Sequence, residues 1–216
     1  MPVTTGSLKS SIIIFDSKWN YQGFKTLPLY GTYTTKYVGG YFYFGSNEHF
    51  YCTDSTFNTI YGDYRSFIAL YRQISYYNSQ FYVASPNHHS IDAISSSFYL
   101  VKNIDMIGYN RPYGLAFLSG NMFVSYENMN QVSVLTNDVV VRNFTIDGCG
   151  NGVSITIDLF GYLPINCSVD NLIVVHDSNG NYLNKSISTL NTPYFTGIDA
   201  IGRFVVMDSN SLDIYY

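Results

Sequence analysis

The stretch at residues 120–135, GNMFVSYENMNQVSVL, alternates apolar and polar residues on both sides of a polar centre. A period of two residues is typical of β-strands, and a polar, Asn-rich centre favours a turn. The stretch therefore predicts a β-hairpin. The next question is whether this hairpin stands alone or is one copy of a repeated unit.

The second strand of this hairpin, QVSVLT at 131–136, has relatives along the whole chain. They are SIDAIS (90–95), HFYCTD (49–54), LIVVHD (172–177), LDIYY (212–216) and IIIFD (12–16). Corresponding positions recur about every 40 residues, and self-similarity at a period of this size indicates a repeat architecture.

Each unit contains four short strand-like stretches and no convincing helix. In the clearest unit they are RPYGLAF (111–117), NMFVSY (121–126), QVSVLT (131–136) and DVVVRNFTI (138–146). Four strands in about 40 residues make the blade of a β-propeller. A β-sandwich would not repeat at this period, and a β-solenoid would need shorter, more uniform coils. We therefore expect one all-β domain over residues 1–216, a β-propeller of four-stranded blades.

The strand counts leave two blade numbers open. Three strand types occur five times, whereas the QVSVLT type occurs six times. About five blades result if strands from both ends of the chain share one blade. Six blades are expected if the chain is a fragment of a longer protein.

The clearest unit also resembles a known family. RPYGLAFLSGNMFVSYENMNQVSVL (111–135) is similar to an NHL repeat in its Pro, its Gly, the following apolar pair, a second Gly, the Val-Ser strand and the Asn before an alternating strand. TGIDAIGRFVVMDSNSLDIY (196–215) is a looser match, in which Asp208 fills the position of the family's usual Asp. The resemblance implies a propeller more than any one activity, because propellers host unrelated functions.

The composition restricts the partners. Charged residues make up 12% of the chain, against about 25% in a typical soluble domain, and 22 Tyr and 15 Phe supply much of the surface and core. A net charge of −4 with 11 Lys and Arg disfavours nucleic acid, including RNA binding of the kind seen in some NHL proteins. No window approaches the ~18 apolar residues of a membrane helix, and the first residues do not form a signal peptide. We expect no membrane insertion, and the compartment stays open.

A binding site is expected where loops of successive blades converge. In a propeller, the loops between second and third strands and the loops that lead to the next blade gather on one face around the channel. The polar residues placed there are Glu48, His49, Asp63, Arg65, His88, His89, Arg111, Tyr113, Glu127 and Asp147. The alternative is that these residues are only the polar turns of any protein.

Catalytic chemistry has weaker signals. His49, His88 and His89 fall in equivalent turns, where some propeller enzymes hold a divalent metal, but no third blade offers a histidine there. No G-x-S-x-G motif occurs. The three cysteines, Cys52, Cys149 and Cys167, have no metal-ligand spacing and are interpreted most simply as free thiols, although one pair could form a disulfide.

The sequence therefore predicts a non-catalytic β-propeller without a cofactor, which binds a protein or carbohydrate partner through its loop-rich face. Exposed Tyr with Asn and Ser suits such a surface. The alternative is a metal-dependent propeller hydrolase or lyase of the lactonase kind, with its site at the channel mouth.

Overall fold

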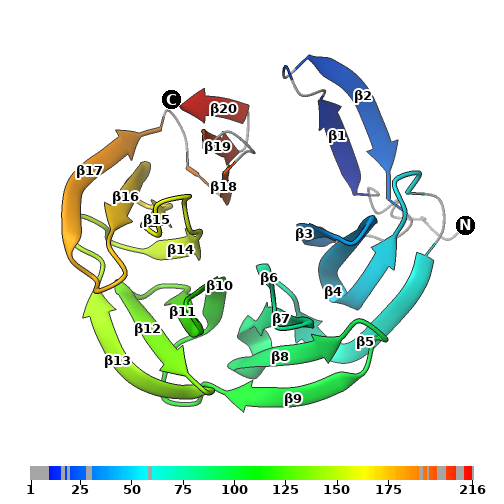
Figure 1. Cartoon of the computed structure of the whole chain (residues 1–216), viewed down its shortest axis with the longest axis horizontal. Coiled ribbons are helices and arrows are strands. Elements are labelled where there is room, and N and C mark those ends of the chain that lie inside the picture. Colours follow the sequence, from blue (N-terminus) through cyan, green and yellow to red (C-terminus); the bar gives the residue numbers. More distant parts are fainter. Residues whose placement is uncertain are drawn as a thin grey trace, which may run out of the picture.

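The computed structural model describes residues 10–15, 18, 20–27, 31–57, 60–189, 192–193, 195–198, 203–207 and 212–215. Over these residues β-strand is the dominant secondary structure, and four four-stranded blades lie in a ring around a central opening (Figure 1). The predicted all-β propeller is confirmed. Among the described residues, no helix is long and apolar enough to span a bilayer.

Three blades each contain four separate antiparallel strands in sequence order. The first has β6 (Ile74–Tyr77), β7 (Gln80–Ser85), β8 (Ser90–Ser95) and β9 (Leu100–Asp105), with the short 3-10 helix η1 (Pro86–His88) after β7. The second has β10 (Pro112–Leu118), β11 (Asn121–Tyr126), β12 (Gln131–Thr136) and β13 (Val139–Thr145). The third has β14 (Gly152–Ile155), β15 (Leu163–Cys167), β16 (Leu172–His176) and β17 (Tyr182–Ser188). The second blade matches the strands expected for residues 111–146.

The fourth blade is built from β3 (Thr32–Val38), β4 (Tyr41–Thr53) and β5 (Ile60–Leu70). Strand β4 supplies two of its strands, because it folds back on itself. The rings of Phe44 and Tyr51 stack with centroids 5.0 Å apart. Seven residues of straight strand would span about 23 Å at ~3.3 Å per residue. The bend therefore lies between these two residues, where Ser46 Oγ donates to the carbonyl of His49 at 3.2 Å.

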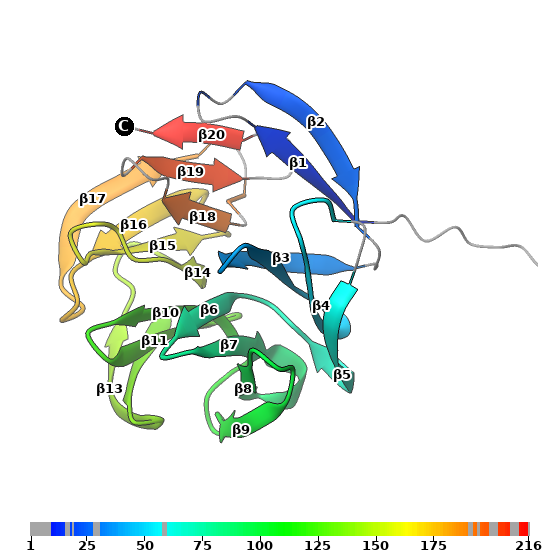
Figure 2. The ribbon, with the colours of Figure 1, turned by 45° about the vertical axis from the view of Figure 1, so that its right-hand side comes forward.

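Two smaller sheets lie between β17 and β3 in the ring (Figure 1). One contains β18 (Phe195–Ile198), β19 (Phe204–Met207) and β20 (Leu212–Tyr215), and the other is the hairpin of β1 (Ser11–Phe15) and β2 (Tyr21–Thr26). The expected blade shared by both ends is not formed by the described strands, since β20 and β1 belong to different sheets. Ile12 and Ile14 of the hairpin instead pack against the Phe44 cluster of β4, and Figure 2 shows the hairpin next to that blade.

The hydrophobic core lies between neighbouring blades rather than in one central mass. One cluster joins Ile91 and Ile104 of one blade to Leu115 and Val124 of the next. Further clusters fill the other blade interfaces, around Phe123 and Ile165, and around Phe50 and Phe81. Because both faces of each blade are covered, the inner strand β11 is buried at five of its six positions. The outermost strand β13 alternates between exposed and half-buried residues.

The cysteines correct one interpretation of the sequence. Cys149 and Cys167 form a disulfide, with Cα atoms 5.4 Å apart, so these two residues are not free thiols. Cys52 is buried in β4 and takes no part in that disulfide. The two paired positions are 18 residues apart, but the turn between β14 and β15 brings Cys167 back beside the start of its own blade.

Candidate binding face

We call the loop face the end of the blades that carries the turn segments 86–89 and 127–130 and the connecting segments 106–111 and 146–151. These segments join second to third strands, or one blade to the next. The predicted site residues were assigned to this face. The structure shows which of them are in contact.

Arg111 connects two blades across the loop face. Its Nη1 lies 2.7 Å from Glu127 Oε2, and its Nη2 donates to Asn87 Oδ1 at 2.8 Å. The backbone N–H of Glu127 also donates to the carbonyl of Arg111 at 2.9 Å. Two of the predicted residues, Arg111 and Glu127, are thus brought together, and Asn87 joins them.

The contacts continue into the next blade. Asn151 Oδ1 accepts the backbone N–H of Asn128 at 2.9 Å. The backbone N–H of the exposed Asp147 donates to Nε2 of His176 at 3.3 Å, although His176 itself is fully buried. Burial lowers the pKa of His176, and the nearby carboxylates of Asp147 and Asp177 oppose that shift. Hydrogen bonds therefore connect segments of the loop face from three blades.

His88 and His89 have different environments. His89 is exposed and adopts a left-handed conformation with φ of 50°, which ends η1. His88 is half-buried, and its Nε2 is enclosed without a hydrogen-bond partner. The hydroxyls of Ser85 and Ser90, the cross-strand pair at the base of the same turn, are likewise enclosed and unpaired.

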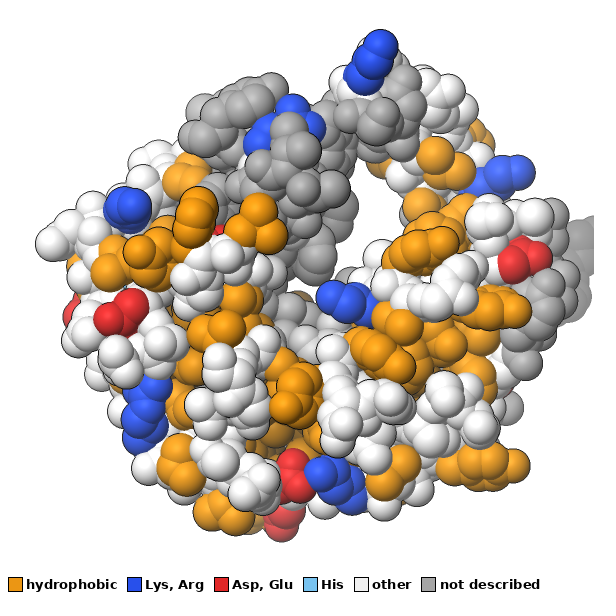
Figure 3. All heavy atoms as spheres, in the orientation of Figure 1, with side chains coloured by type: hydrophobic (Ala, Val, Ile, Leu, Met, Phe, Trp, Pro, Cys, Tyr) orange, Lys and Arg blue, Asp and Glu red, His pale blue; other side chains and the backbone are white. Residues whose placement is uncertain are grey.

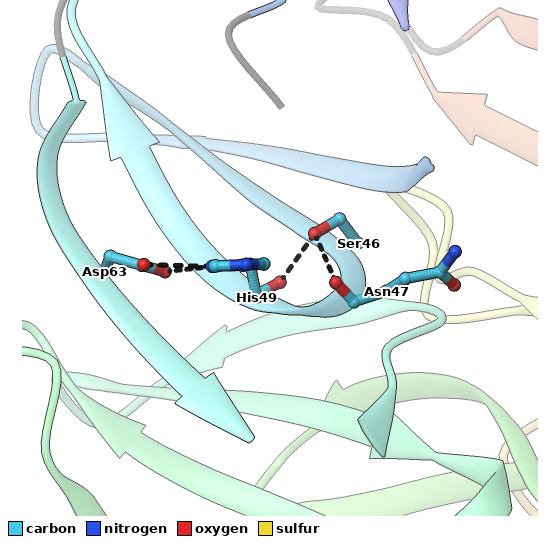
Figure 4. A network of polar contacts seen from close by, with 4 residues as sticks. All are labelled: Ser46, Asn47, His49 and Asp63. Atoms are coloured by element: carbon cyan, nitrogen blue, oxygen red, sulfur yellow. Dashed lines mark hydrogen bonds and ion pairs between the residues drawn. The ribbon is translucent and has the colours of Figure 1, made fainter. Parts of the chain in front are cut away.

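His49 lies at the bend of β4 and pairs with a carboxylate. Its Nδ1 is 2.9 Å from both carboxylate oxygens of Asp63, and Figure 4 shows the two side chains facing one another. Asp63 and Arg65 were expected in a loop, but both lie within β5, where the register pairs Arg65 with His49. The side chains of Glu48 and Arg65 lie outside the described residues.

His49, His88 and His89 do not form a metal-binding group with acids that the structure describes. Within the described part of the chain, no cluster of three or more His, Cys, Asp or Glu side chains could hold a metal ion. His49 is instead occupied by Asp63.

Sequence reasoning missed Arg72, which lies directly before β6 at the inner edge of the loop face. Its guanidinium carbon is 4.2 Å from the ring centroid of Tyr33 and 5.1 Å from that of Tyr113. Tyr113 was predicted as a site residue, whereas Tyr33 was not. Its position in the repeat could have indicated Arg72, because Arg72 and Arg111 both lie just before the first strand of a blade.

Gln73 was missed as well, and it connects three blades. Its Nε2 donates to the carbonyls of Leu115 at 3.0 Å and Ile155 at 2.6 Å, while its Oε1 accepts from Ser154 Oγ at 3.3 Å. These residues belong to β10 and β14, the first strands of the next two blades. One glutamine thus connects the inner edges of three blades.

The first strands enclose a central cavity of about 470 Å³. Residues from β3, β6, β10, β14 and β18 line it together with Gln73, and Lys36 is the charged residue among them. Figure 3 shows a central opening with hydrophobic side chains on its right-hand side, a basic side chain at its edge and charged groups scattered over the visible face. The cavity is therefore the channel of the propeller.

Comparisons with known proteins agree on the fold. The WD40 β-propeller domain of Doa1 superimposes with a TM-score of 0.68 at 14% identity, over 90% of this chain and 64% of that one. A streptogramin B lyase gives 0.69 at 13% identity, over 86% of this chain and 68% of that one. A catalytically inactive virginiamycin B lyase from Staphylococcus aureus, with quinupristin, gives 0.69 at 14% identity, over 85% and 66%.

The chain spans about two thirds of the length of these structures. No protein-family model matches the sequence, and no curated protein matches it. At this level of identity the likeness shows the fold alone.

Proposed function

We propose that this protein is a non-catalytic binding scaffold, which recognises a protein or a carbohydrate through the loop face. The contact that carries the proposal is Arg111 between Asn87 and Glu127. It fixes loops of two blades in one arrangement before any partner arrives. Such pre-organisation reduces the entropy lost on binding.

The chemistry of the face suits recognition. Arg and Tyr are enriched in protein interfaces, because they offer large contact area together with hydrogen-bonding groups. Here Arg72, Arg111, Tyr33 and Tyr113 lie around the channel mouth and its adjoining loops. The predicted residues Glu48, His49, Arg65, His88, His89 and Asp147 complete the proposed binding set.

Two finer assignments remain proposals. We infer that the blades are NHL-like, from the unit at residues 111–135. A lyase or hydrolase activity is the competing function. The lyases that share the fold do not carry their activity to this chain at 13–14% identity.

A comparison of two ion pairs tests the scaffold function. The purified chain is used to select ligands from a displayed peptide library and from a glycan array, and affinities are then measured for Arg111→Ala and Lys102→Ala. Lys102 pairs with Asp138 at the opposite end of the blades, and its side chain is 37% exposed, against 35% for Arg111. The two variants therefore remove similar charges from opposite ends.

We expect Arg111→Ala to weaken the selected ligand at least about tenfold, the loss typical of a central interface arginine. Lys102→Ala should change the affinity less than twofold. If no ligand is selected, or if both variants weaken it equally, the loop face is not the binding surface.

A further inference from the structure

The position of Arg72 is fixed by its backbone. Its N–H donates to the carbonyl of Ala84 at 2.9 Å, and the N–H of Gln73 donates to the carbonyl of Tyr113 at 3.3 Å. Gln73 lines the channel cavity, so the residue before it stands at the channel mouth. Arg72 thus lies on the loop face beside the channel, between the blades that carry β3 and β10.

The side chain of Arg72 is held by rings from the two neighbouring blades. Tyr33 belongs to β3 and Tyr113 to β10, and both rings lie within 5.1 Å of the guanidinium carbon. A cation close to a tyrosine ring is attracted by the electron density of its face. The N–H donors of a guanidinium lie in its own plane, so contacts with ring faces orient the group without using those donors.

The donors of Arg72 have no acidic partner among the described residues. Its Nε is enclosed without a hydrogen-bond partner, whereas its two Nη nitrogens are not enclosed in this way. Two acids of the candidate site are engaged by other residues, Glu127 by Arg111 and Asp63 by His49. The buried Nε without an acceptor is unfavourable, and the Nη donors are available to the acceptors of a ligand.

We propose that Arg72 is the receptor for a single carboxylate, presented by an acidic segment of a protein partner. The proposal rests on the scaffold function and names the chemistry of its ligand. A guanidinium edge matches the two oxygens of a carboxylate. The guanidinium of Arg72 carries a single positive charge, which suits a monoanion better than a doubly charged phosphate. A peptide carboxylate is favoured over an acidic sugar, because Tyr33 and Tyr113 each use one face for Arg72 and so offer less aromatic surface on which a sugar could stack.

Fluorescence anisotropy with defined probes tests the receptor. The probes are a labelled acidic peptide, GSEEEESG, its amide counterpart GSQQQQSG, a phosphoserine peptide and a tetragalacturonate. The proteins are the full chain, Arg72→Gln, Arg72→Lys and Lys185→Gln. Lys185 is exposed on the outermost strand β17, so its variant makes the same change of net charge far from the channel.

We expect the acidic peptide to bind at least tenfold more tightly than the amide peptide. Arg72→Gln should weaken the affinity for the acidic peptide at least tenfold, and Lys185→Gln should weaken it less than twofold. Arg72→Lys should remain several-fold weaker than the parent, because an ammonium cannot form the two-pronged contact. If Arg72→Gln does not fold, Tyr33→Leu replaces it, and a several-fold loss of peptide affinity is expected from the disordered guanidinium.

Three results would overturn the receptor. They are equal binding of the two peptides, an unchanged affinity in the Arg72 and Tyr33 variants, and tighter binding of the phosphopeptide or the galacturonate. The scaffold function is judged separately. If Arg111→Ala loses the library-selected ligand while Arg72→Gln keeps the acidic peptide, the scaffold stands and the receptor fails.

Discussion

Two buried hydrogen-bond networks occupy equivalent positions in neighbouring blades. In one, Asp92 accepts from the Tyr71 hydroxyl at 3.1 Å and from Asn103 Nδ2 at 2.6 Å. In the other, the Tyr126 hydroxyl donates to Ser133 Oγ at 2.6 Å. Asp92 and Ser133 are the polar members of an alternating strand, and both are buried. These polar side chains therefore join strands within a blade and do not face solvent. Burial raises the pKa of Asp92.

His176 gives a pH prediction. Its pKa in the folded protein is lowered by burial, so the unfolded state binds the proton more readily. Stability should therefore fall as the pH is lowered from about 7.5 through the ordinary histidine pKa of ~6.5. The measurement is urea unfolding at several pH values for the parent chain and for His176→Gln.

His176→Gln should lose part of this pH dependence. The loss is measured by comparing the unfolding free energy of the parent and of the variant as a function of pH. His89→Gln serves as the control, because His89 is exposed and its ring has no described hydrogen bond. An identical acid response in the parent and in His176→Gln would show that the buried histidine does not contribute.

Adjacent blades are joined by a repeated contact at their outer edge. Lys102 of β9 pairs with Asp138 in the β12–β13 turn of the next blade. In the same way, Arg142 of β13 donates to the carbonyl of Asn179 in the β16–β17 turn of the blade that follows. The two basic residues occupy equivalent register positions, opposite Ala93 and Val134. Neighbouring blades are thus bridged at the outside by basic side chains and at the inside by Gln73.

Gly114 marks the closest approach between two inner strands. A Cβ at this position would stand 2.9 Å from the backbone nitrogen of Ile155 and 3.1 Å from the Cα of Ser154, and it would also meet Ser125 Oγ. Since backbone of β14 cannot step aside, Gly114→Ala should cost about 1–3 kcal/mol, the usual cost of overpacking. Chemical denaturation measures this loss, with Ser186→Ala on the exposed side of β17 as the control. Equal stability of both variants would contradict the tight packing.

The disulfide gives a second element-scale prediction. Because Cys149 and Cys167 close a loop with a separation of 18 residues, replacing both by Ser should lower the unfolding free energy by about 2–4 kcal/mol. In the denatured, unreduced protein a thiol assay should detect one thiol, from Cys52, and reduction should raise the number to three. Detection of three thiols without reduction would mean that the disulfide does not form.

The whole molecule is a ring in which every blade is stabilised mainly by its neighbours. The four core clusters each bridge two adjacent sheets, including the cluster between β1–β2 and β4. The channel cavity is bordered by first strands from five sheets. A face built from several blades is therefore as rigid as the interfaces beneath it.

Removal of metal ions should leave the thermal stability of the protein unchanged. The loop face is held by hydrogen bonds and ion pairs between the protein's own side chains, so EDTA should leave the melting temperature unchanged. A bound ion would stabilise the folded state by mass action, and its removal would lower the melting temperature. Elemental analysis of the purified protein accompanies the melt. A stoichiometric divalent ion together with an EDTA-sensitive melt would favour the enzyme alternative.

Much of the fold could be predicted from the sequence, because strand alternation and a 40-residue repeat are local and periodic signals. The candidate site was harder to predict. Arg111 and Glu127 were expected on one face and are in contact there, because the repeat shows that both lie in segments at the same end of a blade. Arg72 and Gln73 were missed because their roles depend on residues about 40 and 80 positions away. Asp63 was assigned to a loop because the polar sequence around it resembles a turn, whereas β4 pairs with it as a strand.

The repeating four-stranded unit, the all-β class and the low content of charged residues could be read from the sequence. These properties follow from residue types and their spacing, which need no knowledge of distant contacts. The tertiary structure alone decided that Cys149 and Cys167 are paired, that His49 is occupied by Asp63, and that the guanidinium of Arg72 lies between two tyrosine rings. Each of these depends on the ring bringing distant segments together, because only blade-to-blade packing sets which side chains share the channel mouth.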